Sequence, residues 1–405
     1  MTPLRKPLRV ALVGPLVYEF DNRTMRYARS LHERGDQVQV LAVGRPGDPP
    51  RALVEGIELF RLQNRRRNER GPLSFLLKLG LFLLRSSWFL LRQHRISPYD
   101  LIHVHSVPDF EVFAAIAPKL RGAKVLLDIY DVSPEFYLSK FRQSPGCLGY
   151  QALRQVERVS CRFADHVIAA NHLWRDLLIG RSVPAAKCSV FINYIDLDLF
   201  HPRARTRQDG RFILLYPGVL NWHQGLDIAL RAFAKVKPRA PQAEFHIYGE
   251  GTQKESLRAL ARQLGVSGSV RLMDMAPLGE MPAIMANADV GLVAKRADVF
   301  GNEAYSTKIL EYMSQRLPVV LPRTRIDSFY FNEEVALFYQ PENPTDMAEK
   351  ILALAEDRAL GRRLADAAWT CVRHNSWQAK QHLYLRLVDQ LIGRPGAGAV
   401  EPVVY

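Results

Sequence analysis

The chain has 405 residues, of which 48% are hydrophobic and 24% are charged, and its formal net charge is +14. This length and composition are typical of a globular protein with two or three domains and a large core, and they exclude a disordered or fibrous chain. The excess of lysine and arginine favours an acidic partner: nucleic acid, anionic lipid or a phosphate-bearing substrate.

The four cysteines are far apart and form no C-x-x-C pair, which argues against a zinc ribbon and a redox motif. The first apolar run, in MTPLRKPLRVALVGP, is too short for a signal peptide and predicts a first strand. We therefore expect reduced cysteines and a cytoplasmic protein, with the inner face of the cell membrane as a second location.

The chain opens with a β-α-β pattern. Residues 8–13 form an apolar run, Gly14 follows it, residues 22–34 predict a helix, and residues 37–43 predict a second strand. Such a unit implies a parallel sheet. A single glycine at position 14 is not a G-x-G-x-x-G fingerprint, so a dinucleotide site at this turn is not expected.

Residues 73–91 (LSFLLKLGLFLLRSSWFLL) are the most apolar stretch. Lys78 and Arg85 interrupt it, so no uninterrupted span approaches the ~20 residues of a transmembrane helix. Lys78, Arg85 and Arg92 recur every seven positions and predict one basic helix face, opposite leucines, phenylalanines and Trp88. We expect residues 73–95 to lie on an anionic membrane surface; a crossover helix packed on its own sheet is the alternative.

Two further apolar runs, at residues 100–105 and 124–129, end in polar residues. Because the carboxyl ends of parallel strands line the crevice where such sheets bind ligands, His105, Asp131 and Glu135 are site candidates. A helix-capping role is the alternative for Asp131.

A second α/β array follows a polar, basic segment at residues 201–211, which predicts a linker. Apolar runs at residues 212–216, 244–248 and 269–273 predict strands. Their ends carry a turn at Gly218, a glycine turn at Gly249 and a loop with Met275.

The stretch FGNEAYSTKILEYMSQRLPVV at residues 300–320 combines polar chemistry, a helix start and a buried strand. Ser306, Thr307 and Lys308 predict a helix N-terminus whose backbone N–H groups and adjacent lysine suit an anion such as a diphosphate. Glu303 falls in the preceding loop, and Glu311 lies about one turn into the helix.

The two glutamates in this context resemble the E-x7-E signature of the retaining glycosyltransferases of the large group-1 family, also called family 4. The resemblance implies an α/β GT-B fold with two facing Rossmann-like domains around a cleft. It also implies a nucleotide-sugar donor as co-substrate, with no cofactor. In that family the first glutamate, here Glu303, lies near the transferred sugar, and the second, here Glu311, binds the ribose hydroxyls. Asp131 takes the place from which the first domain faces the sugar.

The resemblance also assigns the remaining site residues. Donor-binding candidates are Glu311, Lys308, Ser306, Thr307, Gly218, Asn221, Gln224, Gly249 and Met275. Acceptor-side candidates, near the first turn and the following strand ends, are Asn22, Arg23 and His105, for which helix capping is the alternative at the first two.

The chain departs from the family pattern in GVLNWHQG, where relatives often read G-R-L-x-x-x-K-G. Val219 replaces the arginine and Gln224 the lysine of the diphosphate clamp, so Lys308, with Asn221 or His223, has to supply the positive charge, or diphosphate binding is weaker than usual. The one Asp-x-Asp sequence begins at Asp196, in the presumed interdomain crossing. We therefore predict a metal-independent enzyme.

These patterns predict four segments: an acceptor-side domain at 1–200, a donor-binding domain at 201–375, a helix at 376–392 that returns to the first domain, and a flexible tail at 393–405. The predicted activity is retaining transfer of a sugar from a nucleotide sugar to an acceptor. Charge and fold together favour a lipid-linked acceptor in polysaccharide or glycolipid synthesis. A nucleotide-sugar epimerase and a catalytically lapsed binding protein are the alternatives; nucleic-acid binding is not expected, because no recognition helix or stacking motif is present.

Overall fold

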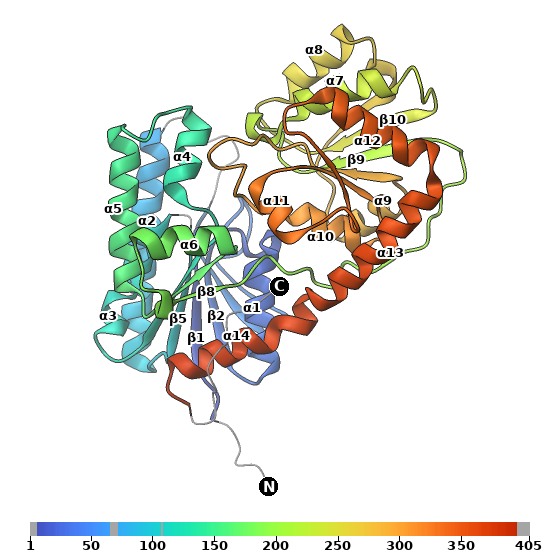
Figure 1. The fold of residues 1–405 in the computed structure, drawn as a ribbon. Coiled ribbons are helices and arrows are strands. Elements are labelled where there is room, and N and C mark those ends of the chain that lie inside the picture. The colour runs from blue at the N-terminus through green and yellow to red at the C-terminus, as the bar shows by residue number, and fades with distance from the viewer. Residues whose placement is uncertain (1–5, 65–71, 107, 395–405) are drawn as a thin grey trace. The chain divides into compact units, whose positions relative to one another are not determined.

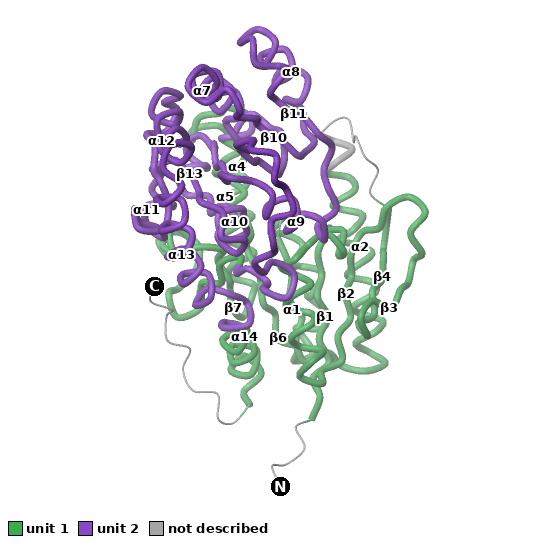
Figure 2. Tube along the Cα trace, turned by 90° about the vertical axis from the view of Figure 1, so that its right-hand side faces the viewer, with its two compact units in different colours: residues 1–138, 142–193, 381–404 green, residues 139–141, 194–380, 405 purple. Residues whose placement is uncertain are grey.

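The computed structural model describes residues 6–64, 72–106 and 108–394, and the chain divides into two compact units (Figures 1 and 2). The first unit takes residues up to 138, residues 142–193 and those from 381 on; the second takes residues 139–141 and 194–380. The break between Asn193 and Tyr194 lies a few residues before position 200, the predicted end of the first domain.

The first unit contains an eight-stranded sheet in the order β3-β4-β2-β1-β5-β6-β7-β8. Its strands are β1 (Arg9–Val13), β2 (Gln37–Gly44), β3 (Arg51–Val54), β4 (Ile57–Asn64), β5 (Leu101–Ser106), β6 (Lys124–Ile129), β7 (His166–Ala169) and β8 (Cys188–Val190). Neighbouring strands pair in parallel except β3 and β4. This β3-β4 hairpin was not predicted; its two turn residues, Glu55 and Gly56, both have positive φ, as a tight hairpin turn requires.

Helices of the first unit cover this sheet (Figure 1). They are α1 (Asn22–Glu33), α2 (Pro72–Ile96), α3 (Ile116–Lys119), α4 (Ser133–Phe141), α5 (Leu148–Phe163) and α6 (His172–Arg181). The inner face of α2 contributes Phe82 and Leu90 to a core that includes Val104 and Val125 of the strands. Among the described residues, no helix has both the length and the apolar character needed to cross a membrane.

The second unit contains a six-stranded, entirely parallel sheet in the order β11-β10-β9-β12-β13-β14. Its strands are β9 (Phe212–Pro217), β10 (Ala243–Tyr248), β11 (Val270–Met273), β12 (Val290–Leu292), β13 (Val319–Pro322) and β14 (Leu337–Tyr339). Its core, which includes Leu214, Phe233 and Phe245, is separate from that of the first unit. Two Rossmann-like units are therefore present, as the α/β alternation predicts.

The second unit's helices are α7 (Leu226–Val236), α8 (Lys254–Gln263), α9 (Met281–Ala286), α10 (Thr307–Ser314), α11 (Arg325–Tyr330), α12 (Pro344–Glu356) and α13 (Arg358–His374). The last helix, α14 (Trp377–Leu391), contributes its residues from Gln381 on to the first unit. There the Tyr384 hydroxyl lies 3.0 Å from Nδ1 of His103. Of the predicted tail, residues 395–405 lie outside the described residues, as do residues 65–70 of the basic run after β4.

Candidate functional site

Two glycines bring the backbone close together at the carboxyl edge of the second sheet. The Gly218 N–H, after β9, donates to the Tyr248 carbonyl oxygen at 2.8 Å. A Cβ atom on Gly249, after β10, would lie 1.8 Å from the Gly218 carbonyl oxygen, so only glycine fits there. Gly218 and Gly249, two of the predicted donor-binding positions, therefore present backbone atoms and no side chain at this edge.

Lys308 lies directly beside this turn. A Cβ atom on Gly218, whose φ is +142°, would lie 2.6 Å from Cε of Lys308. The Lys308 ammonium group is 5.1 Å from the centre of the Tyr216 ring. Burial lowers the pKa of Lys308, an effect that the carboxylate of Glu311 partly opposes. The structure thus brings together Gly218 and Lys308, which are far apart in the sequence.

The start of α10 lies where the sequence predicts a helix N-terminus. Ser306 occupies the N-cap position and Thr307 is the first helical residue, as predicted. However, no N–H group within the described chain donates to the Ser306 hydroxyl, so this side chain does not cap the helix as a serine at this position often does. The Ile309 N–H donates to the Ser306 carbonyl oxygen at 3.2 Å, whereas the Thr307 and Lys308 N–H groups have no acceptor among the described residues, as an anion-binding helix end requires.

Tyr312 fixes α10 against the sheet. Its hydroxyl donates to the carbonyl oxygens of Leu215 at 3.1 Å and Leu292 at 3.2 Å. The ring lies so close to Gly291 in β12 that a Cβ atom there would be 2.4 Å from it. Glu311, one position earlier, is half-buried. The helix face that carries Lys308 and Glu311 is therefore positioned by a buried tyrosine over a strand glycine.

Glu303 lies in the loop before α10, and its carboxylate is paired with Arg325. The distance from Arg325 Nη1 to Glu303 Oε1 is 2.7 Å. The buried ammonium group of Lys295 holds the same loop, because it donates to the Ala304 carbonyl oxygen at 2.6 Å and lies 3.0 Å from the carboxylate of Asp327. The sequence analysis missed these supporting residues, because their partners are distant in the chain.

The other donor-side candidates have different surroundings. The Asn221 Oδ1 accepts a hydrogen bond from the Thr252 hydroxyl at 3.3 Å, and the Gln224 Oε1 accepts one from the Tyr216 hydroxyl at 2.9 Å. The side chains of Val219 and Met275 are exposed. Gln224, which stands where relatives have lysine, is therefore held by a core tyrosine beside the Gly218 turn.

The first unit has a pocket of about 340 Å³ at the carboxyl ends of three adjacent strands, β1, β5 and β6. Its lining is formed by Pro15, Leu16, Val17, Phe20, Asp21, His105, Ser106, Tyr130 and Asp131. His105 and Asp131, predicted from strand ends, thus share one pocket. Burial raises the pKa of Asp131 to about 6.

Arg23 lies outside this lining and faces the protein interior. Its Nε and Nη2 atoms donate to the two carboxylate oxygens of Asp128 at 2.8 and 2.7 Å. Burial favours a higher pKa for Asp128, but the charge of Arg23, with hydrogen bonds from His105 and Arg23, holds that pKa below its usual range. Asn22 is also outside the lining and begins α1. The Arg23 side chain is therefore engaged with Asp128, and the acceptor-side role of Asn22 and Arg23 stays a prediction.

Two further residues clarify this region. Asp128 was missed, although a charged residue inside the apolar run KVLLDI was a signal for it. Glu135, a candidate from the sequence, is paired with Arg181 at 2.6 Å, which indicates a structural role.

His103, His105 and Asp128 offer donor atoms within 4.8 Å of one another and could by type hold a metal ion. However, the bidentate Arg23 already occupies both oxygens of Asp128. A dication would lie against the guanidinium, so these residues do not fit a metal well.

Comparison with known proteins identifies the class. The model of the glycosyl transferase 4-like domain matches residues 21–193, and that of the glycosyl transferases group 1 matches residues 200–369. Among solved structures, sucrose-phosphate synthase from Thermosynechococcus elongatus has a TM-score of 0.79 at 18% identity, covering 95% of this chain and 99% of the other. Anabaena HepE in complex with UDP and glucose has a TM-score of 0.70 at 15% identity, covering 94% and 99%. The fold is therefore GT-B.

The chain belongs to the group 1 glycosyl transferases, since the two family models together match both units. A curated relative, the glycogen synthase of Mycobacterium tuberculosis, is 25% identical over 276 residues, which are 66% of this chain and 63% of the relative. The chain thus spans less than two thirds of the length of this relative. The expected fold class and family are confirmed.

Proposed function

We propose that the chain is a retaining glycosyltransferase that moves a sugar from a nucleotide-sugar donor to an acceptor. The main observation behind this proposal is that Lys308, at the start of α10, lies beside the Gly218 turn at the carboxyl edge of the second sheet. Helix N–H groups, a lysine and open glycine backbone there converge on a place that suits a diphosphate. Family membership supports this use of the edge.

In this proposal the second unit binds the donor. The N-terminal N–H groups of α10 and the Lys308 ammonium group stabilise the charge that develops on the leaving diphosphate. Lys308 replaces the clamp residues absent at Val219 and Gln224. Because these protein groups supply the positive charge, the transfer needs no metal ion. The Glu311 carboxylate accepts hydrogen bonds from the ribose hydroxyls.

Glu303 faces the transferred sugar. Its ion pair with Arg325 holds the carboxylate in place. A fixed negative charge there favours the oxocarbenium-like character of the transition state. Retention of the anomeric configuration follows from the family resemblance, and we assign no nucleophile.

The pocket of the first unit takes the acceptor. Asp131, with a pKa of about 6, is mostly ionised at neutral pH and basic enough to accept a proton from an attacking hydroxyl. His105 lines the same pocket, and its Nδ1 lies 2.9 Å from the Tyr130 hydroxyl, which orients the ring.

The first experiment is thermal unfolding with a panel of nucleotides and nucleotide sugars, with and without EDTA. One base should raise the melting temperature, because a ligand that binds only the folded state stabilises it. Glu311→Ala should abolish the shift. Glu255→Ala, an exposed glutamate on α8, is the matched control and should keep it.

Absence of a shift with every nucleotide would contradict the donor site and favour a lapsed binding protein. A shift that EDTA removes would contradict metal independence. With the donor known, NMR of the product reports the anomeric configuration, and conversion of the donor without any acceptor would indicate an epimerase instead.

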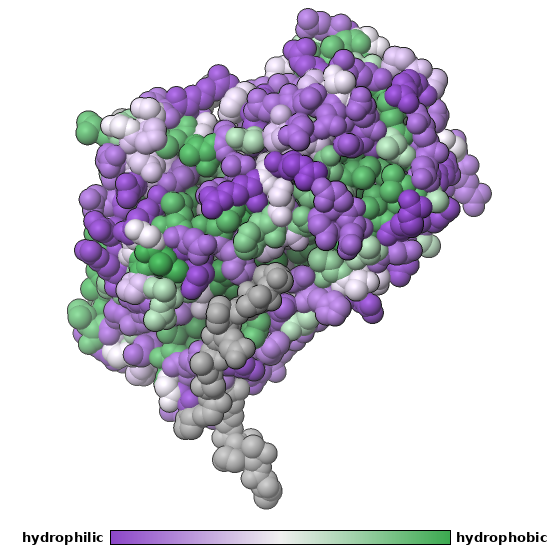
Figure 3. All heavy atoms as spheres, in the orientation of Figure 1, coloured by the Kyte–Doolittle hydropathy of each residue, from purple (hydrophilic) through white to green (hydrophobic). Residues whose placement is uncertain are grey.

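We further propose that the acceptor is lipid-linked and that the outer face of α2 contacts an anionic membrane. Leu77, Leu84 and Trp88 on this face are 74%, 68% and 60% exposed. The Arg92 guanidinium lies 5.4 Å from the centre of the Trp88 ring, so Trp88 is beside the basic residues and the predicted opposite placement is wrong. Figure 3 shows hydrophobic patches among hydrophilic ones on the face it draws.

The inner face of α2 packs on the sheet, as the crossover-helix alternative predicts, and its exposed outer face, which is apolar with a basic flank, supports the membrane proposal. An exposed apolar face with tryptophan and arginine is typical of interfacial helices. Polysaccharide and glycolipid assembly on a lipid carrier would place the acceptor at such a surface.

Vesicle flotation tests this contact. The protein should bind vesicles of phosphatidylglycerol more than those of phosphatidylcholine, and Leu84→Ser with Trp88→Ser should weaken binding. Leu148→Ser is the control, because Leu148 on α5 is also an exposed leucine. Equal binding by all three proteins, or none to phosphatidylglycerol, would contradict the membrane proposal.

A further inference from the structure

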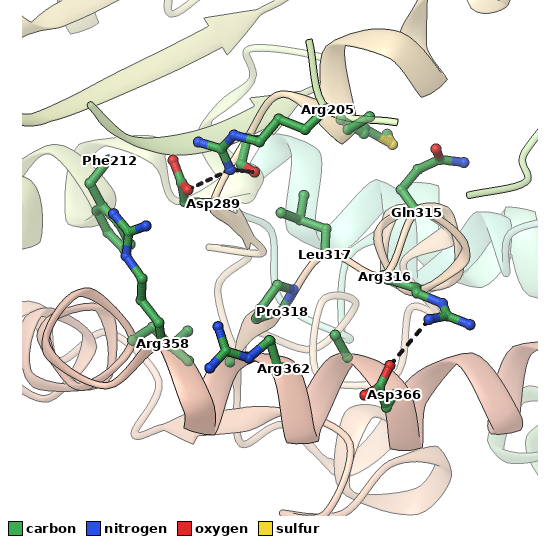
Figure 4. Close-up of a pocket in the computed structure, with 16 residues that line it drawn as sticks. Arg205, Phe212, Asp289, Gln315, Arg316, Leu317, Pro318, Arg358, Arg362 and Asp366 are labelled. Atoms are coloured by element: carbon green, nitrogen blue, oxygen red, sulfur yellow. Dashed lines mark hydrogen bonds and ion pairs between the residues drawn. The ribbon is translucent and has the colours of Figure 1, made fainter. Parts of the chain in front are cut away.

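A pocket of about 470 Å³ lies at the amino ends of strands β9, β12 and β13, at the edge of the second sheet opposite the proposed donor site. Phe212 begins β9, and Asp289 and Pro318 directly precede β12 and β13. Figure 4 shows side chains of α13 entering the pocket from the side facing these strand ends. The donor proposal makes no use of this edge.

Four arginines line this pocket: Arg205, Arg316, Arg358 and Arg362. Asp289 pairs with Arg205 at 2.7 Å and also with Arg207 at 2.6 Å. Asp366 lies 3.4 Å from Arg316. The lining therefore has four positively charged and two negatively charged side chains. Arg207, outside the lining, shares the carboxylate of Asp289 with Arg205.

Arg358 and Arg362 have no carboxylate partner in the lining, although Arg362 interacts electrostatically with Asp357, the N-cap of α13, outside it. They lie one helical turn apart on α13, where like charges repel. Neither makes an ion pair with any residue of the described chain. In Figure 4 the Arg358 side chain extends from α13 toward Phe212 at the start of β9, and the Arg362 side chain extends along α13. An anion between them would relieve the repulsion.

Arg316 adds an independent observation, because its backbone is strained. Its φ is +54°, in the left-handed region. It follows the end of α10, where the N–H groups of Arg316 and Leu317 donate to the carbonyl oxygens of Met313 at 3.1 Å and Tyr312 at 3.0 Å. Glycine is the usual residue at this position of a helix end. An arginine at this position destabilises the left-handed backbone conformation, and its side chain lines the pocket.

Apart from Gln315, the rest of the lining is apolar. Phe212, Met285, Leu317 and Leu354 are buried or line the wall, and Gly361 leaves space between the two α13 arginines. A Cβ atom on Gly361 would meet Pro318 at 3.3 Å. Bare phosphate would not use this wall, whereas a molecule with an organic body would.

We propose that this pocket binds an organic phosphate, such as a sugar phosphate, at a site separate from the donor site. Guanidinium groups bind phosphate oxygens through paired hydrogen bonds, and Arg358 and Arg362, which have no ion-pair partner in the described chain, offer such groups at this cavity. The volume lies within the range of small-molecule sites.

Isothermal titration calorimetry with glucose 6-phosphate, inorganic phosphate and glucose tests this site. Glucose 6-phosphate should bind more tightly than inorganic phosphate, and glucose should not bind. Arg358→Ala with Arg362→Ala should raise the dissociation constant by about tenfold or more, since two charge-assisted contacts are lost. Arg363→Ala, a neighbouring exposed arginine outside the lining, should leave the constant unchanged.

Two variants separate this site from the donor site and from misfolding. Lys308→Met should leave binding of glucose 6-phosphate unchanged. Arg316→Gly should weaken binding while raising the melting temperature, because glycine relieves the left-handed backbone. Stability and binding would thus change in opposite directions, which unfolding does not explain.

The proposal is overturned if glucose 6-phosphate does not bind, if Lys308→Met abolishes its binding while the α13 double variant retains it, or if inorganic phosphate binds equally well. The first two results leave the nucleotide-dependent shift of the donor site untouched, so the two proposals fail separately.

Discussion

Buried carboxyl groups of the first unit differ in whether a positive partner accompanies them. Asp128 is paired with Arg23, which holds its pKa low. Glu111 is fully buried, and neither of its carboxyl oxygens has a hydrogen-bond partner within the described chain. Burial raises the pKa of Glu111 to about 8, so its side chain is protonated at neutral pH.

Glu111→Gln should therefore remove a pH-dependent loss of stability. Between the unfolded pKa of about 4.5 and the folded pKa of about 8, the unfolded chain releases a proton that the folded chain retains, so stability falls as pH rises. The variant should gain most at pH 8 and above and little at pH 4. Urea unfolding at both values checks this, and an equal gain at both would contradict the protonated Glu111.

Lys308 gives a pH dependence to nucleotide binding. Because burial lowers its pKa, the ammonium group loses its proton at a lower pH than an exposed lysine does, and nucleotide affinity should fall as pH rises through that value. Lys308→Arg should remove this fall, and Lys308→Met should weaken binding about tenfold or more at neutral pH. Titrations from pH 7 to 10 measure both effects; identical profiles for wild type and Lys308→Arg would exclude Lys308 as the titrating group.

At the scale of elements, the packing of α10 on the sheet determines where Lys308 and Glu311 lie. Tyr312 lies over Gly291 and bonds to two strand carbonyl groups. In the first unit, the ends of β1, β5 and β6 instead bring His105 and Asp131 into one pocket. Both sites therefore depend on contacts between elements far apart in the sequence.

Gly291→Ala should damage the donor site from within the core. The added methyl group would lie 2.4 Å from the Tyr312 ring, and overpacking of this kind costs about 1–3 kcal/mol. The displaced α10 should also bind nucleotide more weakly. Gly180→Ala in α6, where a Cβ meets nothing within 4 Å, should stabilise by up to ~1 kcal/mol and leave nucleotide binding unchanged. Unfolding curves and titrations of the two variants test the contrast.

At the scale of the whole molecule, the chain forms two units with separate cores, and we propose that each unit binds a different substrate. The first unit contains the pocket proposed for the acceptor, with Asp131, and the second contains the residues proposed to bind the donor, with Glu311. The arginine-lined pocket lies wholly in the second unit, at the other edge of its sheet.

Because the two proposed binding sites lie in different units, one variant in each unit should impair a different property of the protein. Asp131→Asn should lower turnover by about 10²-fold or more, because the base is lost, while the nucleotide-induced rise in melting temperature stays. It should also stabilise the free protein at pH 7, since burial disfavours the charged form of Asp131. Glu311→Ala should remove the nucleotide-induced rise. Loss of that rise in Asp131→Asn would contradict the placement of the two sites in different units.

Much of the fold was predictable because its signals are local. Apolar runs ended by glycine or polar residues located most strands and helices, and the spacing of Glu303 and Glu311 indicated the family. The β3-β4 hairpin was missed, although Glu55 and Gly56 form its turn, because charged residues interrupt its apolar runs. Helix α11 was missed because it is short.

The site was predictable only in part. Strand ends indicated His105 and Asp131, because the carboxyl ends of adjacent parallel strands meet at one edge. The turn of Arg23 toward Asp128 was not predictable, since it depends on a partner 105 positions away. The same holds for the Arg325 partner of Glu303, 22 positions away.

By itself the sequence determined the two α/β arrays, the family signature and the start of α10, because periodicity, capping residues and motif spacing act over a few neighbouring residues. Only the tertiary structure decided that Lys308 lies against Gly218, that Gln224 bonds to Tyr216, and that arginines from three segments surround one pocket. Such contacts depend on how strands are ordered in a sheet and how helices pack on it, and this order brings together side chains that the linear chain keeps far apart.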